Sequence, residues 1–218
     1  QPPYSHKPPL GKRYEQLMKN FGCNYAIPFS SMHRYNRSDS IHMNQFVADI
    51  NEHRDSFVEN EGYLLPAYVF WDTEKENYHE IVTEINNDTI KPPEYFGDIY
   101  ADQLDVNDKE MITKYFRGFE GLSKYFEFLT FRVGGSDFNI KLSNRNNGCG
   151  IIFECPRKSL MTAIKYEIFD DMLIGNFMKT TIVGQKGLHP YFTPYVTKYG
   201  DNGQAKSVEE LESYFSYY

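Results

Sequence analysis

Serine, histidine and charged side chains follow a short apolar stretch at residues 25–29, and they are the residue types in this chain best suited to chemistry. The point where a buried strand opens into a loop is where α/β enzymes place functional side chains. His33 is the candidate metal ligand, because a neutral imidazole is a common metal ligand. The hydroxyls of Ser30 and Ser31 could position a phosphate or a bound water. Arg34 and Asp39 could contact an anionic substrate and orient the imidazole.

Each of these residues also has a structural interpretation. A lone histidine more often hydrogen-bonds backbone in a loop, and the two serines could cap the strand end or the next turn. Arg34, Arg37 and Asp39 could form a solvated surface cluster. His42 and His53 lie in the same polar region, but their spacing from His33 matches no short metal motif. The carboxylates of Asp170 and Asp171 could form a pair in which one carboxyl group stays protonated, but we expect them to cap a helix or to bond backbone amides rather than catalyse.

Composition limits the classes of function. The chain has 218 residues, a net charge of −7 and a pI near 5.4, which disfavour nonspecific binding to nucleic acid or to an anionic membrane. No apolar run reaches the roughly 18–20 residues of a membrane span. Cys23, Cys149 and Cys155 form no CxxC pair, so we expect free thiols in a reducing, cytoplasmic compartment and no cysteine-based zinc site. The sequence does not start with Met, and we expect the native start to lie upstream.

In the first half, helical spacing of apolar residues predicts a helix over 11–21, followed by a buried strand over 23–29. Asp39 is the expected N-cap of a short helix. Residues 63–71 predict a strand that Pro66 places at an edge or a bulge. The Lys91-Pro92-Pro93 sequence predicts a boundary between two regions, 1–91 and 92–218.

The second half predicts an α+β unit. Asp105 or Asn107 could cap a long helix that runs to about Phe126, with Phe116, Phe119 and Leu122 on its buried face and Asp108, Lys109 and Lys114 in water. Glycine-containing turns at 134–135 and 146–148 separate candidate strands and predict a β-meander. The expected strands are 128–133, 138–142, 150–155 and 180–183, and the expected later helices are 158–166 and 207–217.

Two motifs resemble a known family. The sequence Ile27-Pro28-Phe29-Ser30-Ser31-Met32-His33, continued by Arg37-Ser38-Asp39-Ser40, and the sequence Phe169-Asp170-Asp171-Met172-Leu173-Ile174-Gly175-Asn176-Phe177-Met178-Lys179-Thr180 both resemble the C-terminal part of metallo-β-lactamase-fold proteins of the CMP-N-acetylneuraminic acid hydroxylase-like group. The motifs occur in the same order and span most of the chain.

The resemblance implies an α+β chain: the last helix and strand of the αββα fold in residues 1–91, then an accessory domain in 92–218. It implies part of a hydrolase or oxidoreductase that uses zinc or iron, with His33 at the rim of the metal site and a small-molecule substrate. The HxHxDH metal motif is absent from the sequence, so we expect no metal in this chain alone. The expected partner is the N-terminal half of the same protein or a second copy. The alternative is a noncatalytic module, because residues 105–183 are similar in layout to a sterol-carrier-like domain that binds a small ligand.

Overall fold

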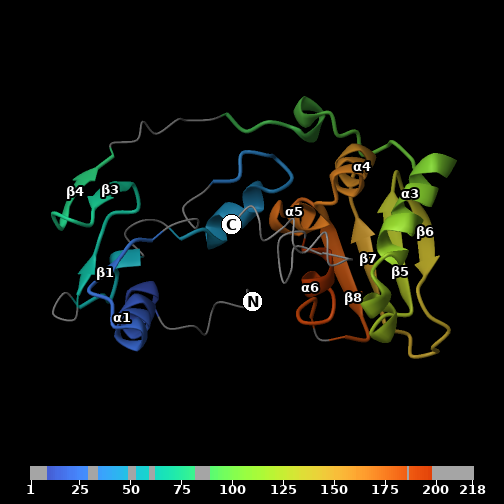
Figure 1. Ribbon diagram of the computed structural model, residues 1–218. Helices are drawn as coiled ribbons and strands as arrows, with labels where there is room; N and C mark the ends of the chain where they lie inside the picture. The colour runs from blue at the N-terminus through green and yellow to red at the C-terminus, as the bar shows by residue number, and fades with distance from the viewer. Residues whose placement is uncertain are drawn as a thin grey trace. The chain divides into compact units, whose positions relative to one another are not determined.

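The computed structural model describes residues 9–28, 34–48, 53–58, 62–81, 89–185 and 187–197. The chain divides into two compact units, Gln1–Lys91 and Pro92–Tyr218, called here the N-terminal and C-terminal units. The division falls at the Lys91-Pro92-Pro93 sequence. Both units mix helices with sheets, so the chain is α+β (Figure 1).

The N-terminal unit begins with a helix that leads into a short parallel strand pair. Helix α1 (Leu10–Phe21) ends at Gly22, whose φ of 66° lets its N–H bond the Met18 carbonyl. Strand β1 (Tyr25–Ala26) then pairs in parallel with β2 (Tyr63–Leu64). The predicted strand over 23–29 is therefore shorter within the described residues, and it is half-exposed rather than buried.

A hairpin and a 3₁₀ helix complete this unit. Strands β3 (Val69–Asp72) and β4 (Asn77–Glu80) pair antiparallel, and the break after β2 at Pro66 corrects the single strand predicted over 63–71. The 3₁₀ helix η1 (Ile41–Phe46) has Ser40 as its N-cap, so the prediction of Asp39 as N-cap is wrong.

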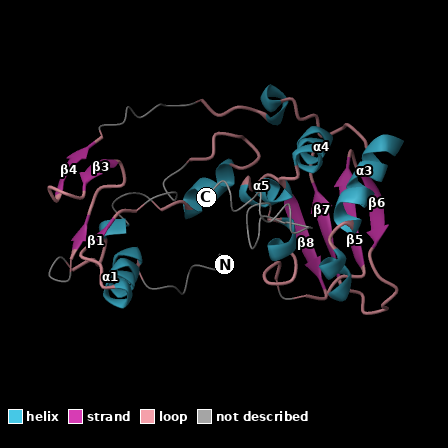
Figure 2. Cartoon of the chain, in the orientation of Figure 1, coloured by secondary structure: helices cyan, strands magenta, loops and turns pink. Residues whose placement is uncertain are grey.

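The C-terminal unit contains a four-stranded sheet of order β6-β5-β7-β8 (Figure 2). The strands are β5 (Phe128–Val133), β6 (Ser136–Lys141), β7 (Gly150–Glu154) and β8 (Lys179–Val183). The pairs β5–β6 and β7–β8 are antiparallel, whereas β5–β7 is parallel.

The prediction of a β-meander is wrong because β7 returns on the far side of β5. In a meander β7 would pair with β6, but the connection 142–149 crosses the start of β5 instead. Glu127 holds both ends of that crossing. Its carbonyl accepts from Leu142 N at 2.8 Å, and its own N–H donates to the Cys149 carbonyl at 2.7 Å.

Helices pack on one face of this sheet. They are α3 (Val106–Arg117), α4 (Arg157–Tyr166), α5 (Phe169–Ile174), the short α6 (Thr193–Val196) and the 3₁₀ helix η4 (Glu120–Lys124). The 3₁₀ helix η3 (Pro93–Phe96) opens the unit and has no buried residue. Asp105, one of the two caps that the sequence predicted, is the N-cap of α3 and forms a capping box in which its side chain accepts from Asp108 N. The long helix predicted to reach Phe126 ends at Arg117, and the chain continues as η4. No helix in the described part of the chain is both long and apolar enough to cross a membrane.

Stacked and edge-to-face phenylalanines form the centre of this core. Phe116 meets Phe131 of β5 with ring centroids 5.1 Å apart and Phe169 of α5 at 4.9 Å. Phe153 of β7 and Phe192 close the cluster, and all five side chains are fully buried. Such rings bury large apolar areas and gain further from offset geometry, so this unit has a dense, specific core.

Long-range polar contacts fasten the start of α4. Asp98 is buried and accepts from Ser159 N at 3.0 Å and from Ser159 Oγ at 2.6 Å. Arg157 donates to Asp108 Oδ2 at 2.6 Å and to Asp105 at 3.1 Å. The expectation that Asp108 lies in water is therefore wrong, because Arg157 pairs with it at the junction of α3 and α4.

Candidate functional site

The polar segment at residues 34–47 of the N-terminal unit is the first candidate site. Arg37 and Asp39 form a two-pronged ion pair, with Nε–Oδ1 at 2.7 Å and Nη2–Oδ2 at 3.0 Å. Their side chains are 13% and 19% exposed, so the pair is partly shielded from water. Because each charge offsets the other, the pair fixes the shape of the segment more than it attracts an anion.

Backbone contacts hold this segment in place. The Asn44 side chain clamps Tyr35, accepting from its N–H at 2.7 Å and donating to its carbonyl at 2.9 Å. Lys91 runs parallel to Arg37 and donates its N–H to the Asn36 carbonyl at 2.8 Å. The segment is thus an ordered loop, which suits it to carry positioned side chains.

Of the sequence-predicted site residues, Ser30, Ser31 and His33 lie outside the described residues. Arg34 is described and exposed, and Asp39 is held by Arg37. The structure therefore places Asp39 in an ion pair, and it leaves the proposed roles of the five residues as predictions.

The described residues contain no group of three or more His, Cys, Asp or Glu side chains that could hold a metal ion. His53 is buried in the N-terminal unit, with its Nδ1 2.8 Å from the Tyr14 hydroxyl. Burial raises the pKa of the Cys155 thiol to about 12, with smaller effects from Asp98 and Glu154. A protonated buried thiol is neither a nucleophile nor a ready metal ligand, and Cys155 is part of the apolar core of the C-terminal unit.

Asp170 and Asp171 lie within the first turn of α5, whose N-cap is Ile168. They are therefore not the N-cap residues, and the alternative that they bond backbone amides stays a prediction. Carboxylates in the first turn of a helix still interact favourably with its N-terminal dipole.

A second candidate site is a groove where α3 and η4 border β6. One cavity of about 640 Å³ lies between η4 and the end of β6, and a second of about 510 Å³ lies between α3 and Phe138 of β6. Arg117 lines both, so the two cavities adjoin at this residue, and together they are called here the α3–β6 groove.

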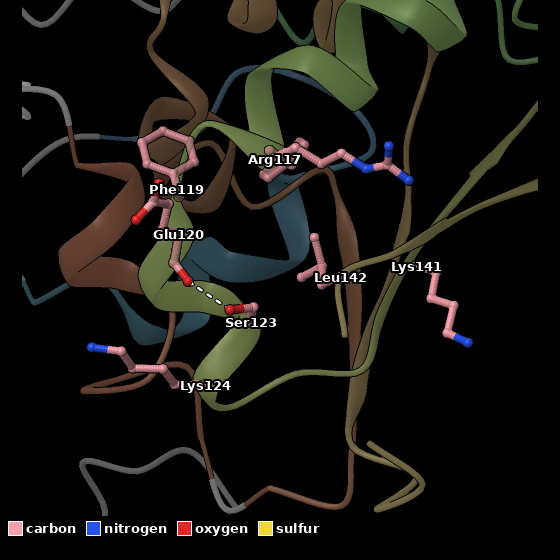
Figure 3. A pocket seen from close by; sticks show the side chains of 8 residues that line it. Arg117, Phe119, Glu120, Ser123, Lys124, Lys141 and Leu142 are labelled. Atoms are coloured by element: carbon pink, nitrogen blue, oxygen red, sulfur yellow. Dashed lines mark hydrogen bonds between the residues drawn. The ribbon is translucent and has the colours of Figure 1, made fainter. Parts of the chain in front are cut away.

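The groove is cationic over an apolar floor. Lys109, Lys114, Arg117 and Lys124 line it, with Lys141 at the end of β6, against the two carboxylates of Glu110 and Glu120. Figure 3 shows the guanidinium of Arg117 and the ammonium of Lys141 on the same side of Leu142, with Lys124 and Glu120 on the opposite side. An excess of cations stands out in a chain whose net charge is −7.

Sequence reasoning missed this groove, although a signal for it exists. The lining residues of α3 recur every three to four positions: Val106, Lys109, Glu110, Thr113, Lys114 and Arg117. That stripe is the polar face opposite the buried Ile112 and Phe116. A stripe of this kind is normally only a solvated face, and its neighbour β6 could not be placed beside it from the sequence.

Comparison of this chain with protein-family models, curated proteins and solved structures finds no significant match.

Proposed function

We propose that this chain is the C-terminal part of a metal-dependent enzyme of the metallo-β-lactamase fold, a hydrolase or hydroxylase. Residues 1–91 would form one edge of its active site. The observation that carries the proposal is the order helix α1, strand β1, polar segment, with β1 in a parallel pair. Helix-connected parallel strands with polar residues at their carboxyl ends are the arrangement in which α/β enzymes place chemistry.

The exposed apolar surface of the N-terminal unit supports the need for a covering polypeptide. Parallel strands are normally buried on both faces. Here the side chains of Phe21, Tyr63 and Phe70 are 75%, 61% and 62% exposed. Among the described residues of this unit, Met18 and Leu65 are the buried apolar side chains of its core. A second polypeptide segment against this surface would complete the layer.

The metal would have to be held largely by residues beyond those described. The described residues supply no ligand set, and His33 is one ligand where a zinc site takes three or four. When bound, zinc or iron would activate water or oxygen. The part assigned to this chain is to place Ser30, Ser31, Arg34 and Asp39 beside the substrate. The ordered loop clamped by Asn44 supports that assignment.

Metal analysis tests the proposal. The isolated chain should carry less than stoichiometric zinc or iron. The protein translated from the whole reading frame should carry metal that falls in His33→Ala and stays in His79→Ala, a control at an exposed position of β4. Loss of substrate turnover should accompany loss of metal. Unchanged metal in His33→Ala, or a reading frame that encodes no further metal ligands, would contradict the proposal.

The alternative, a noncatalytic module for a small apolar or amphipathic ligand, stays a prediction. The two cavities of the C-terminal unit lie at its surface beside cations, and its phenylalanine core is filled. An apolar ligand would remain partly in water there.

A further inference from the structure

We propose that the edge of β6, together with the α3–β6 groove, binds an extended acidic peptide segment of a partner protein as a fifth strand of the sheet. The proposal is independent of the metal-dependent function above. It depends on three features of the described residues: an unpaired strand edge, a groove of matching length beside it, and an excess of cations in that groove.

The edge of β6 offers unused backbone groups. β6 is the terminal strand of the sheet, and within the described residues no strand pairs with its outer side (Figure 1). Val133 and Ser136 flank the two-residue turn, and Leu142 N bonds the Glu127 carbonyl, which fixes the hydrogen-bonding register of the hairpin. In that register the N–H and C=O groups of Asp137, Asn139 and Lys141 point away from β5. A peptide strand can satisfy these alternating donors and acceptors.

The groove fits a short extended segment. Helix α3 has 12 residues, about 18 Å at 1.5 Å per residue, and β6 has 6 residues, about 20 Å at 3.4 Å per residue. An extended peptide of five or six residues would span both. On a peptide paired with β6, every second side chain faces α3, and these side chains would reach the cations above Phe138. Lys109 Nζ already lies 6.0 Å from the centre of the Phe138 ring.

Charge selects an acidic partner. Lys109, Lys114, Arg117 and Lys124 line the groove against Glu110 and Glu120. The side chain of Lys141 shares the far face of β6 with Asp137, because side chains of a strand alternate. The acidic residue of the β6 edge itself, Asp137, is held by Arg132 at 2.7 and 3.0 Å on the opposite face of the sheet. Its charge is offset there and does not oppose an acidic peptide on the α3 side.

Two other occupants fit less well. A second copy of the chain paired through β6 would bring the same cations of α3 against themselves. A sugar–phosphate backbone could meet the cations but carries no regular donors for the outward carbonyls of β6. An oligonucleotide and self-association are therefore outcomes of the test rather than the proposal.

Fluorescence anisotropy with labelled octapeptides tests the proposal. The probe is an acidic peptide in which glutamate and valine alternate. One control replaces each glutamate by lysine, and a second control is the acidic peptide with its valine backbone nitrogens methylated. We expect saturable binding of the acidic probe that is about tenfold or more tighter than that of the lysine peptide, and weaker at high salt. N-methylation should abolish binding, because it removes the donors that pair with β6 and leaves the protein untouched.

Variants of the chain locate the site. Lys109→Glu with Lys114→Glu should weaken binding at least about fivefold, while Lys165→Glu on α4 should leave it unchanged. Asn139→Pro removes an outward N–H and should weaken binding, whereas Asn139→Ala keeps that N–H and should not. Thermal melts confirm that each variant is folded.

Equal binding of the acidic and lysine peptides, no saturable binding, or equal binding of the N-methylated peptide would overturn the proposal. So would tighter binding of a labelled oligothymidylate than of the acidic probe. A dimer in sedimentation that becomes a monomer in Asn139→Pro would assign the edge to a second copy instead.

Discussion

Replacing the buried carboxylate of Asp98 should destabilise the C-terminal unit more than any other single polar change near α4. Pro156 is the N-cap of α4 and makes no side-chain cap hydrogen bond, so the helix start depends on an acceptor from elsewhere. Asp98 supplies it, accepting from the N–H of Ser159, the third residue of the helix, and from its hydroxyl. The exposed fraction of Asp98 is 1%, so water cannot replace the lost acceptor.

The magnitude follows from the two bonds. A hydrogen bond to a charged group contributes about 1.5–3 kcal/mol, and loss of an N-cap costs about 0.5–2 kcal/mol. Asp98→Ala should therefore lower the free energy of unfolding by about 3 kcal/mol. Ser159→Ala removes the hydroxyl bond alone and should cost about 1 kcal/mol. Asp98→Asn keeps one oxygen acceptor and should fall between the two.

Urea unfolding followed by far-ultraviolet circular dichroism measures these values, and amide hydrogen exchange at Ser159 locates the effect. Trp71, the single tryptophan, lies in the N-terminal unit, and its fluorescence provides a separate signal for that unit. The double variant Asp98→Ala with Ser159→Ala should cost less than the sum of the single variants, because the residues share a bond. A cost for Asp98→Ala below that of Ser159→Ala would refute the reasoning.

Two further predictions concern the hairpin turn and the buried thiol. Gly134 and Gly135 have φ of 59° and 74°, so alanine at either position should lower the free energy of unfolding, measured by heat or urea, by about 1 kcal/mol. Alanine at Gly134 should cost at least about 1 kcal/mol more, because its Cβ would lie 2.6 Å from the Asp102 carbonyl oxygen. At pH 8 a thiol reagent should modify exposed Cys23 in the folded chain but Cys155 only after unfolding. Because the pKa of the folded Cys155 thiol is raised to about 12, only the unfolded thiol ionises between about pH 8.5 and that value. The stability that this thiol contributes should therefore be intact below about pH 8.5 and be lost as the pH rises toward about 12. The Cys155→Ala variant should not show this loss.

Local signals in the sequence predicted the elements of the C-terminal unit well. The strand over 128–133, the helix near 158–166 and the Asp105 cap follow from alternation, periodicity and capping chemistry, all of which act within a few residues. The arrangement of the strands does not follow, because turn residues fix a tight hairpin but not the side on which a longer connection returns. The crossing of 142–149 past Glu127 depends on tertiary hydrogen bonds.

The end of α3 at Arg117, where a longer helix was predicted, shows that one spacing of apolar residues can fit two kinds of helix. Phe116, Phe119, Leu122 and Tyr125 are spaced by three, which suits a 3₁₀ helix as well as one face of an α-helix. The chain uses that spacing after Gly118, whose N–H bonds the carbonyls of Lys114 and Tyr115 at 3.2 and 3.1 Å. Three of these side chains then pack against the core on a tighter turn.

For the candidate sites, sequence reasoning found residue types but not their partners. The sequence offered a solvated surface cluster of Arg34, Arg37 and Asp39 as one interpretation, whereas Arg37 and Asp39 form a bidentate pair that is partly shielded from water. The burial of Asp108 was not, because its partner Arg157 is distant in sequence. The groove was missed for the same reason: its helix and its strand become neighbours only through the fold.

The two proposed interaction surfaces differ in physical character, and salt should separate them. The N-terminal unit exposes aromatic side chains such as Phe21, Tyr63 and Phe70, so a covering polypeptide would bind mainly by apolar burial. The α3–β6 groove would bind mainly through exposed cations, whose attraction falls over about 8 Å at physiological salt and about 3 Å at 1 M. Raising the salt from about 0.05 to about 1 M should therefore release an acidic peptide while leaving or strengthening association through the N-terminal unit. A partner that binds a chain with Phe21→Ser and Phe70→Ser, is released by salt and no longer binds a chain with Lys109→Glu belongs to the groove. A partner that binds the Lys109→Glu chain, resists salt and no longer binds the chain with Phe21→Ser and Phe70→Ser belongs to the aromatic surface.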